Sequence, residues 1–137
     1  MIAISDLDST AREYLRAAKL LRTRRSYDAS VYLCGYAVEI ALKARICRYL
    51  KWTTGFPETG KEFGLKANLK THDLEALLEY TGLQHRVLSP SSNGVLGDWS
   101  VVIKWSPEQR YNPKGTKTFA DANNMITSTQ ILLRILL

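Results

Sequence analysis

Apolar residues recur at helical spacing in the first part of the chain. Between residues 10 and 25 they fall every three or four positions, while Arg and Lys occupy the opposite side. This pattern predicts an amphipathic helix with one buried stripe. We expect it to begin near Thr10, because Thr10 and Glu13 have the spacing of a capping box. The stripe consists of Ala11, Tyr14, Leu15, Ala18 and Leu21.

The next segment is apolar over far more than one stripe. Ser26 is suited to cap a helix that continues to about Leu50, with mostly Ala, Val, Leu, Ile and Cys inside it. We interpret it as the central helix, which contacts several neighbours or a partner subunit. Gly35 lies inside it and costs about 1 kcal/mol relative to Ala. We therefore expect another backbone to approach closely at Gly35.

Helical patterns become shorter after this segment. Glycine, proline and lysine are frequent in residues 51–70, which predicts an exposed connection. Thr71 then caps a third predicted helix over 72–80, and Gly82 ends it.

Two more helices are predicted in the last third of the chain. A turn-rich stretch at 89–94 precedes a short helix over 96–103, with a strand over 101–103 as the alternative. The last helix runs from Thr118 to the C-terminus, because Thr118 is a suitable cap and Asp121 favours the positive helix end.

These elements together predict an all-α protein. Four long or medium helices with long connections favour an antiparallel up-and-down four-helix bundle with one additional short helix. The length of 137 residues, the hydrophobic fraction of 45% and the charged fraction of 23% are typical of one globular unit. We therefore expect a single helical domain over residues 1–137.

The sequence shows no sign of a membrane protein. The uncharged run of the central segment, residues 29–38, is about half as long as a bilayer crossing requires. The first ten residues, MIAISDLDST, lack the basic-then-apolar order of a secretory signal. We expect a cytoplasmic protein with no membrane partner.

The chain is basic, with 19 Lys and Arg residues against 13 Asp and Glu residues and a net charge of +6. This excess favours an acidic partner such as a nucleotide or RNA. The cations cluster at 16–25 and 45–51, near the predicted C-terminal ends of the first two helices. There they also stabilise the helices by facing exposed carbonyl groups, and this structural role is the favoured interpretation.

Three short strings carry a family resemblance. The central helix contains GYAVEIALKA at 35–44, the third helix begins with THDL at 71–74, and Arg110-Tyr111 follows Trp105. Their order and spacing resemble the HEPN family, small helical bundles found beside minimal nucleotidyltransferases, in toxin–antitoxin pairs and in defence proteins. The resemblance implies a homodimer that acts with a nucleotidyltransferase-like partner in such a system.

The resemblance does not extend to the catalytic motif of the family. Catalytic HEPN members are metal-independent ribonucleases with an Arg followed, after four to six residues, by a His. No His follows Arg110, and neither His72 nor His85 has an Arg at that distance upstream. We expect a non-catalytic or catalytically degenerate module, because the group needed for acid–base cleavage is missing. Two alternatives stay open: direct nucleotide or RNA binding through a basic Arg-Tyr site, and a HEPN ribonuclease of unusual composition.

Glu39 interrupts the apolar central helix and needs a cationic partner, because burying an unpaired carboxylate is costly. Lys43 lies one turn later, in the order that favours an ion pair. A structural Glu39–Lys43 pair is the favoured interpretation, and a ligand site is the alternative. Arg110 could instead be the partner of Glu39 and tether its loop to the bundle.

Arg110 and Tyr111 follow a predicted short turn, because Ser106 and Gln109 have capping-box spacing and Pro107 suits the first helical position. A guanidinium beside an aromatic ring is suited to bind a phosphate and stack on a base. In the equally weighted alternative, Arg110 binds Glu39 and Tyr111 packs inside. Trp105 could also stack on a base, although a core or interface role is favoured.

We interpret His72, Asp73 and Gly35 as structural residues. A His followed by one Asp is not a metal site, since zinc needs three or four converging ligands. The chain also contains no glycine-rich nucleotide-binding motif. We therefore expect no metal, no organic cofactor and no catalytic residue.

Overall fold

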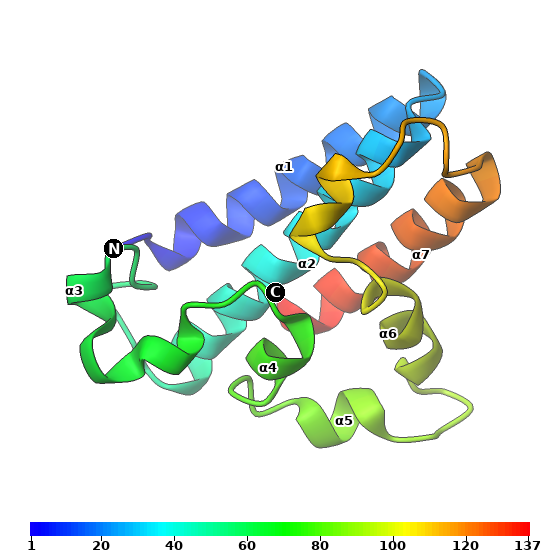
Figure 1. The fold of residues 1–137 in the computed structure, drawn as a ribbon. Coiled ribbons are helices and arrows are strands. Elements are labelled where there is room, and N and C mark those ends of the chain that lie inside the picture. The colour runs from blue at the N-terminus through cyan, green and yellow to red at the C-terminus, as the bar shows by residue number, and fades with distance from the viewer.

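All regular structure in the protein is helical, which confirms the predicted class. The computed structural model describes residues 1–137 and contains three long helices, α1 (Ile4–Thr23), α2 (Tyr27–Tyr49) and α7 (Phe119–Leu136). They lie side by side, and α2 packs against both of the others (Figure 1). None of the helices combines the length and the apolar character that a membrane span requires.

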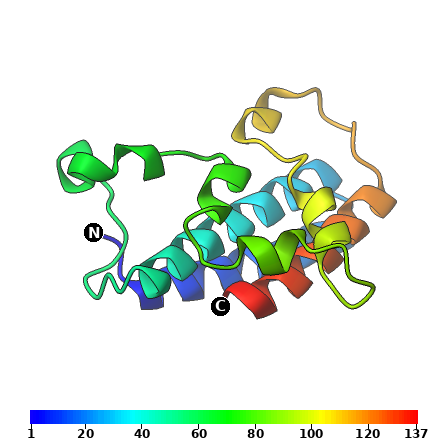
Figure 2. The ribbon, with the colours of Figure 1, turned by 90° about the horizontal axis from the view of Figure 1, so that it is seen from below.

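Shorter segments connect α2 to α7, and the parts around α3 and η2 lie on the same side of the long helices (Figure 2). The predicted third helix is only five residues long, so the exact four-helix arrangement is not confirmed. Two α-helices and a 3₁₀ helix form where only connections were expected: α3 (Gly60–Phe63), η1 (Gly64–Leu69) and α5 (Gln84–Leu88). The remaining short helices are α4 (Leu74–Leu78), α6 (Leu96–Val102) and η2 (Pro107–Tyr111). Because α6 is helical, the alternative of a strand over 101–103 is wrong.

The hydrophobic core surrounds α2. Helices α1, α7 and α4 pack against this helix from different directions, and one continuous cluster of buried apolar side chains draws on all of them. The broad apolar surface of α2 is therefore covered within the chain, which explains why its sequence shows no single stripe.

Gly35 makes room for an aromatic side chain. The ring of Trp105, which follows α6, lies against Gly35, and a Cβ atom built there would come within 2.1 Å of the ring. Tyr36 packs edge-to-face on the same ring, with the two centroids 5.0 Å apart. The expected close approach at Gly35 is right in position but wrong in partner, because an indole fills the space instead of a backbone.

The first helix begins at Ile4, well before the expected start at Thr10. Thr10 therefore lies inside α1, and the predicted capping box with Glu13 does not form. Glu13 instead pairs with Arg16, whose Nη2 lies 2.5 Å from Glu13 Oε1. The Thr118 cap predicted at the start of α7 is confirmed, and the structure shows a full capping box there: Thr118 and Asp121 each accept a hydrogen bond from the other's backbone N–H.

The third predicted helix is capped by Asp73 instead of Thr71. The Asp73 carboxylate accepts hydrogen bonds from the backbone N–H groups of Glu75 (3.0 Å) and Ala76 (3.2 Å). Thr71 Oγ1 accepts a hydrogen bond from the backbone N–H of Asp73 at 3.0 Å. The chain is therefore still non-helical at His72, which leaves that side chain free to reach another element.

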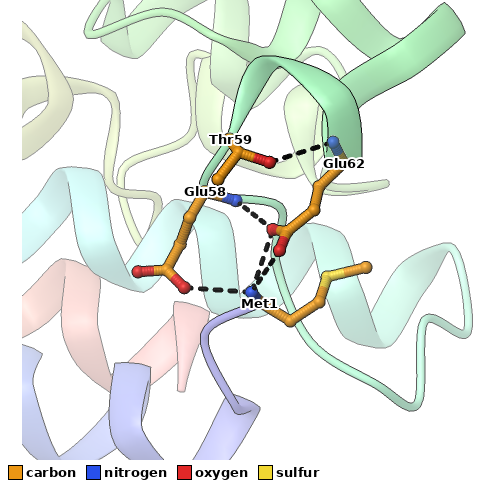
Figure 3. A network of polar contacts seen from close by, with 4 residues as sticks. All are labelled: Met1, Glu58, Thr59 and Glu62. Atoms are coloured by element: carbon orange, nitrogen blue, oxygen red, sulfur yellow. Dashed lines mark hydrogen bonds and ion pairs between the residues drawn. The ribbon is translucent and has the colours of Figure 1, made fainter.

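The terminal ammonium group of Met1 joins the start of α1 to the region of α3 (Figure 3). It donates hydrogen bonds to Glu58 Oε2 and Glu62 Oε2, both at 2.9 Å. Thr59 caps α3 by accepting a hydrogen bond from the backbone N–H of Glu62 at 3.2 Å. This network holds the segment that follows α2, including α3, against the beginning of α1.

Candidate anion-binding site

A pocket of about 540 Å³ lies where the start of α2 meets the chain that follows η2. Residues 112–118, drawn in orange, pass beside the turn between α1 and α2 in both views (Figures 1 and 2). Most residues around the pocket are polar or charged, and Tyr32 contributes an aromatic wall. The pocket therefore offers polar and charged groups beside apolar surface.

Basic side chains dominate this pocket. Arg25, Arg110, Lys114 and Lys117 line it, and Asp28 is its one acidic lining residue. Arg25 forms the turn between α1 and α2 in a left-handed conformation (φ 62°), which is uncommon for a residue with a side chain. The local excess of positive charge favours an anionic ligand.

Asp28, in the first turn of α2, binds the loop across the pocket. Its carboxylate accepts hydrogen bonds from the backbone N–H groups of Gly115 and Lys117, the latter at 2.8 Å, and from the Thr116 hydroxyl at 3.4 Å. Partial burial acts to raise the pKa of Asp28, but these hydrogen bonds outweigh it and lower the pKa below its usual value. Asp28 is therefore ionised at neutral pH.

Arg110 is presented by η2. Pro107 occupies the first turn of η2 as predicted, but Ser106 makes no capping hydrogen bond. Gln109 Nε2 donates instead to the backbone carbonyl of Lys104 at 3.0 Å, which closes the turn. The turn thus holds Arg110 at the edge of the pocket.

The guanidinium of Arg110 lies over the ring of Tyr111, with Cζ 4.8 Å from the ring centroid. The phenol groups of Tyr111 and Tyr32 raise the pKa of Arg110, so its charge is permanent. Tyr111 is 75% exposed and does not pack inside. The alternative in which Arg110 ties the loop to Glu39 while Tyr111 packs is not what the structure shows.

Glu39 lies outside this pocket, in an ion-pair network of its own. Only 2% of the residue is exposed, and Oε1 lies 3.5 Å from Lys43 Nζ and 2.5 Å from His72 Nδ1. The predicted Glu39–Lys43 pair is present, and His72 is a second partner that links the chain before α4 to α2. Lys43 also lies 5.3 Å from the centroid of the Phe56 ring, so Lys43 and Glu39 serve the fold at this place.

Trp105 belongs to the core beneath η2. It is 5% exposed and contacts the rings of Tyr32 and Tyr36 as well as Gly35. A second hollow beside it, lined by His72 and Ser106, has more acidic than basic residues around it. The residues predicted for one site are therefore divided: Arg110 lines the basic pocket and Tyr111 lies beside it, whereas Trp105, Glu39 and Lys43 do not face a common ligand.

The turn after α1 and the start of α2 form one wall of this pocket, and they lie in a segment of the chain that matches a known family. The family model of the HEPN domain matches residues 4–53. The predicted resemblance is confirmed over this segment, and the HEPN domain is associated with nucleotide- and RNA-related functions. A search of curated proteins found no match, and a search of solved structures found none either.

The segment that matches the HEPN model supplies only one side of the pocket. Arg25, Asp28 and Tyr32 lie within residues 4–53, whereas Arg110 and the two lysines come from the chain beyond it. Arg25 belongs to the basic cluster at 16–25, for which a structural role was favoured over anion binding. Asp28 and Tyr32 were missed, because nothing local connects the start of α2 with a loop almost ninety residues later. The string PKGTK at 113–117 was an available clue, since it places two lysines around a turn-forming glycine just after Arg110.

The structure gathers no group of three or more His, Cys, Asp or Glu side chains that could hold a metal ion. The chemistry that the pocket offers is that of fixed positive charge, backbone N–H donors and phenol groups. Groups of this kind are suited to bind and orient an anion, and no His, the usual group for proton transfer, lines the basic pocket.

Proposed function

We propose that this chain is a non-catalytic HEPN-like module that binds a phosphate-bearing ligand, a nucleotide or RNA, in the basic pocket at the start of α2. The observation that carries the proposal is that four basic residues, from two parts of the chain more than eighty residues apart, line one pocket of about 540 Å³. The HEPN match over residues 4–53 supports a nucleotide- or RNA-related role.

The chemistry of the pocket fits a phosphate group. Arg110 offers a planar fork of N–H donors that matches phosphate oxygens, and the lysines add mobile point charges. The exposed ring of Tyr111 lies next to this guanidinium. It provides a surface on which a base can stack while the phosphate is held.

The proposal is tested by titrating the protein with ATP and with a short single-stranded RNA by calorimetry, at low and at moderate salt. Arg110→Ala and Lys114→Ala should each weaken binding about tenfold, the usual value of a hydrogen bond to a charged group. Arg12→Ala is the matched control, because Arg12 is exposed on α1 and does not line the pocket. Binding by Arg110→Ala equal to that of the unmodified protein would overturn the proposal, and cleavage of the RNA would overturn the non-catalytic part.

The HEPN match also supports a second, compatible proposal. The module forms a homodimer in the cytoplasm and acts with a nucleotidyltransferase-like partner in a toxin–antitoxin or defence system. Because α1, α7 and α4 cover α2, the dimer surface has to lie on other elements than the apolar faces of α2. Light scattering that gives the mass of a monomer at all concentrations tested would contradict this proposal.

A further inference from the structure

The loop at 114–117 binds the carboxylate of Asp28, an anionic group of the same chain. The backbone N–H groups of Gly115 and Lys117 point at one carboxylate, that of Asp28, and the Thr116 hydroxyl adds a third contact. Gly115 has a φ of 85°, which a residue with a side chain adopts only with strain. Backbone N–H groups that a turn directs at one point form a concavity that binds anions, and here the N–H groups of residues 115 and 117 do so.

The surroundings favour an anion with more charge than a carboxylate. Asp28 contributes one negative charge to a pocket whose lining residues carry four positive charges, on Arg25, Arg110, Lys114 and Lys117. A terminal phosphate carries between one and a half and two negative charges at neutral pH, by the same rule as a phosphorylated side chain. It also has three acceptor oxygens, whereas the carboxylate has two.

We propose that residues 114–117 form the phosphate-binding part of the pocket and that Asp28 occupies it until a terminal phosphate of the ligand displaces the carboxylate. This inference rests on the proposed function and narrows it. A nucleoside polyphosphate or a 5′-phosphorylated RNA end displaces Asp28, whereas an internal phosphodiester, with a single negative charge, competes poorly with it. Asp28 thereby sets both the affinity of the site and its preference for terminal phosphates.

The test compares Asp28→Asn with the unmodified protein in titrations with ATP, inorganic tripolyphosphate, and one RNA sequence with and without a 5′-phosphate. Removing an internal competitor raises the fraction of protein that is competent to bind, so ATP and tripolyphosphate should bind about tenfold more tightly. Asp6→Asn is the matched control, because Asp6 is also a first-turn acid but lies in α1 outside the pocket. It should leave all affinities unchanged.

Thermal unfolding separates displacement from a loss of loop structure. Asp28→Asn should unfold at a lower temperature than the unmodified protein without ligand, and saturating tripolyphosphate should raise its Tm by more than it raises that of the unmodified protein. If Asp28→Asn binds tripolyphosphate no more tightly than the unmodified protein, or if the 5′-hydroxyl RNA binds as well as the 5′-phosphorylated RNA, this inference is wrong while the proposed function stands. If neither protein binds any of the four probes, both fail.

Discussion

At the scale of single residues, the buried carboxylate of Glu39 joins two distant parts of the chain. Its pair with Lys43 could be predicted, because side chains four positions apart are neighbours on a helix. Its contact with His72 could not, because no local rule pairs residues that are 33 positions apart. These contacts are important for stability because Glu39 is only 2% exposed, so water cannot replace a lost partner.

Replacing Glu39 by Gln should therefore destabilise the protein by roughly 1–3 kcal/mol, because Lys43 and His72 lose a buried charged acceptor. The measurement is the free energy of unfolding in urea. Glu13→Gln is the control, since Glu13 forms a comparable pair with Arg16 at the surface, and it should leave stability unchanged within error. Equal effects of the two substitutions would contradict the buried role of Glu39.

The two cysteines provide a second prediction at this scale. Burial raises the pKa of Cys34 to about 12 and that of Cys47 to about 11. The thiolate is the reactive form, so neither thiol should react with iodoacetamide at pH 8 while the protein is folded. Mass spectrometry should show both alkylated once urea unfolds the chain, and rapid alkylation of Cys34 in the native protein would show that α2 opens.

At the scale of elements, prediction succeeded where the determinant is local. The start of α7 follows from Thr118 and Asp121, which cap it by contacts within four residues. The start of α1 was missed because Ala3, at its N-cap, makes no side-chain hydrogen bond, while Thr10 imitates a cap inside the helix. The third helix is shorter than expected because Asp73 caps it one residue after His72, which binds Glu39.

The contact between α2 and Trp105 gives a prediction for this scale. Gly35→Ala should destabilise the protein by roughly 1–3 kcal/mol, because the new methyl group would overlap the buried ring of Trp105 and force it to shift. Gly97→Ala is the control, since Gly97 lies in helix α6 and no atom approaches the position of its missing Cβ. It should stabilise the protein by up to about 1 kcal/mol, and urea unfolding measures both. Tolerance of Ala at position 35 would mean that Trp105 does not dock there.

At the scale of the whole molecule, the sequence predicted the class of the fold and one side of the pocket. Arg110 and Tyr111 stood out because a guanidinium and an aromatic ring follow a proline-initiated turn. Arg25 and Asp28, on the opposite wall, did not stand out as binding residues, because they look like ordinary residues at a helix end. Only the packing of α1, α2 and the chain after η2 brings them together, so the pocket is a product of tertiary structure.

The contact between Asp28 and residues 115–117 predicts how the molecule responds to acid. An unfolded Asp has a pKa of about 3.9, and hydrogen bonds lower the pKa of Asp28 in the fold. The stability from this contact is therefore complete above the unfolded pKa and is lost as the pH falls through the folded pKa.

The Tm difference between the unmodified protein and Asp28→Asn should be constant above about pH 5 and should shrink below about pH 4, because protonated Asp28 resembles Asn. Thermal melts followed by circular dichroism, at several pH values above and below this range, measure the Tm difference. All other carboxylates are common to both proteins, so a difference that persists undiminished in acid would mean that an ionised Asp28 does not hold the loop.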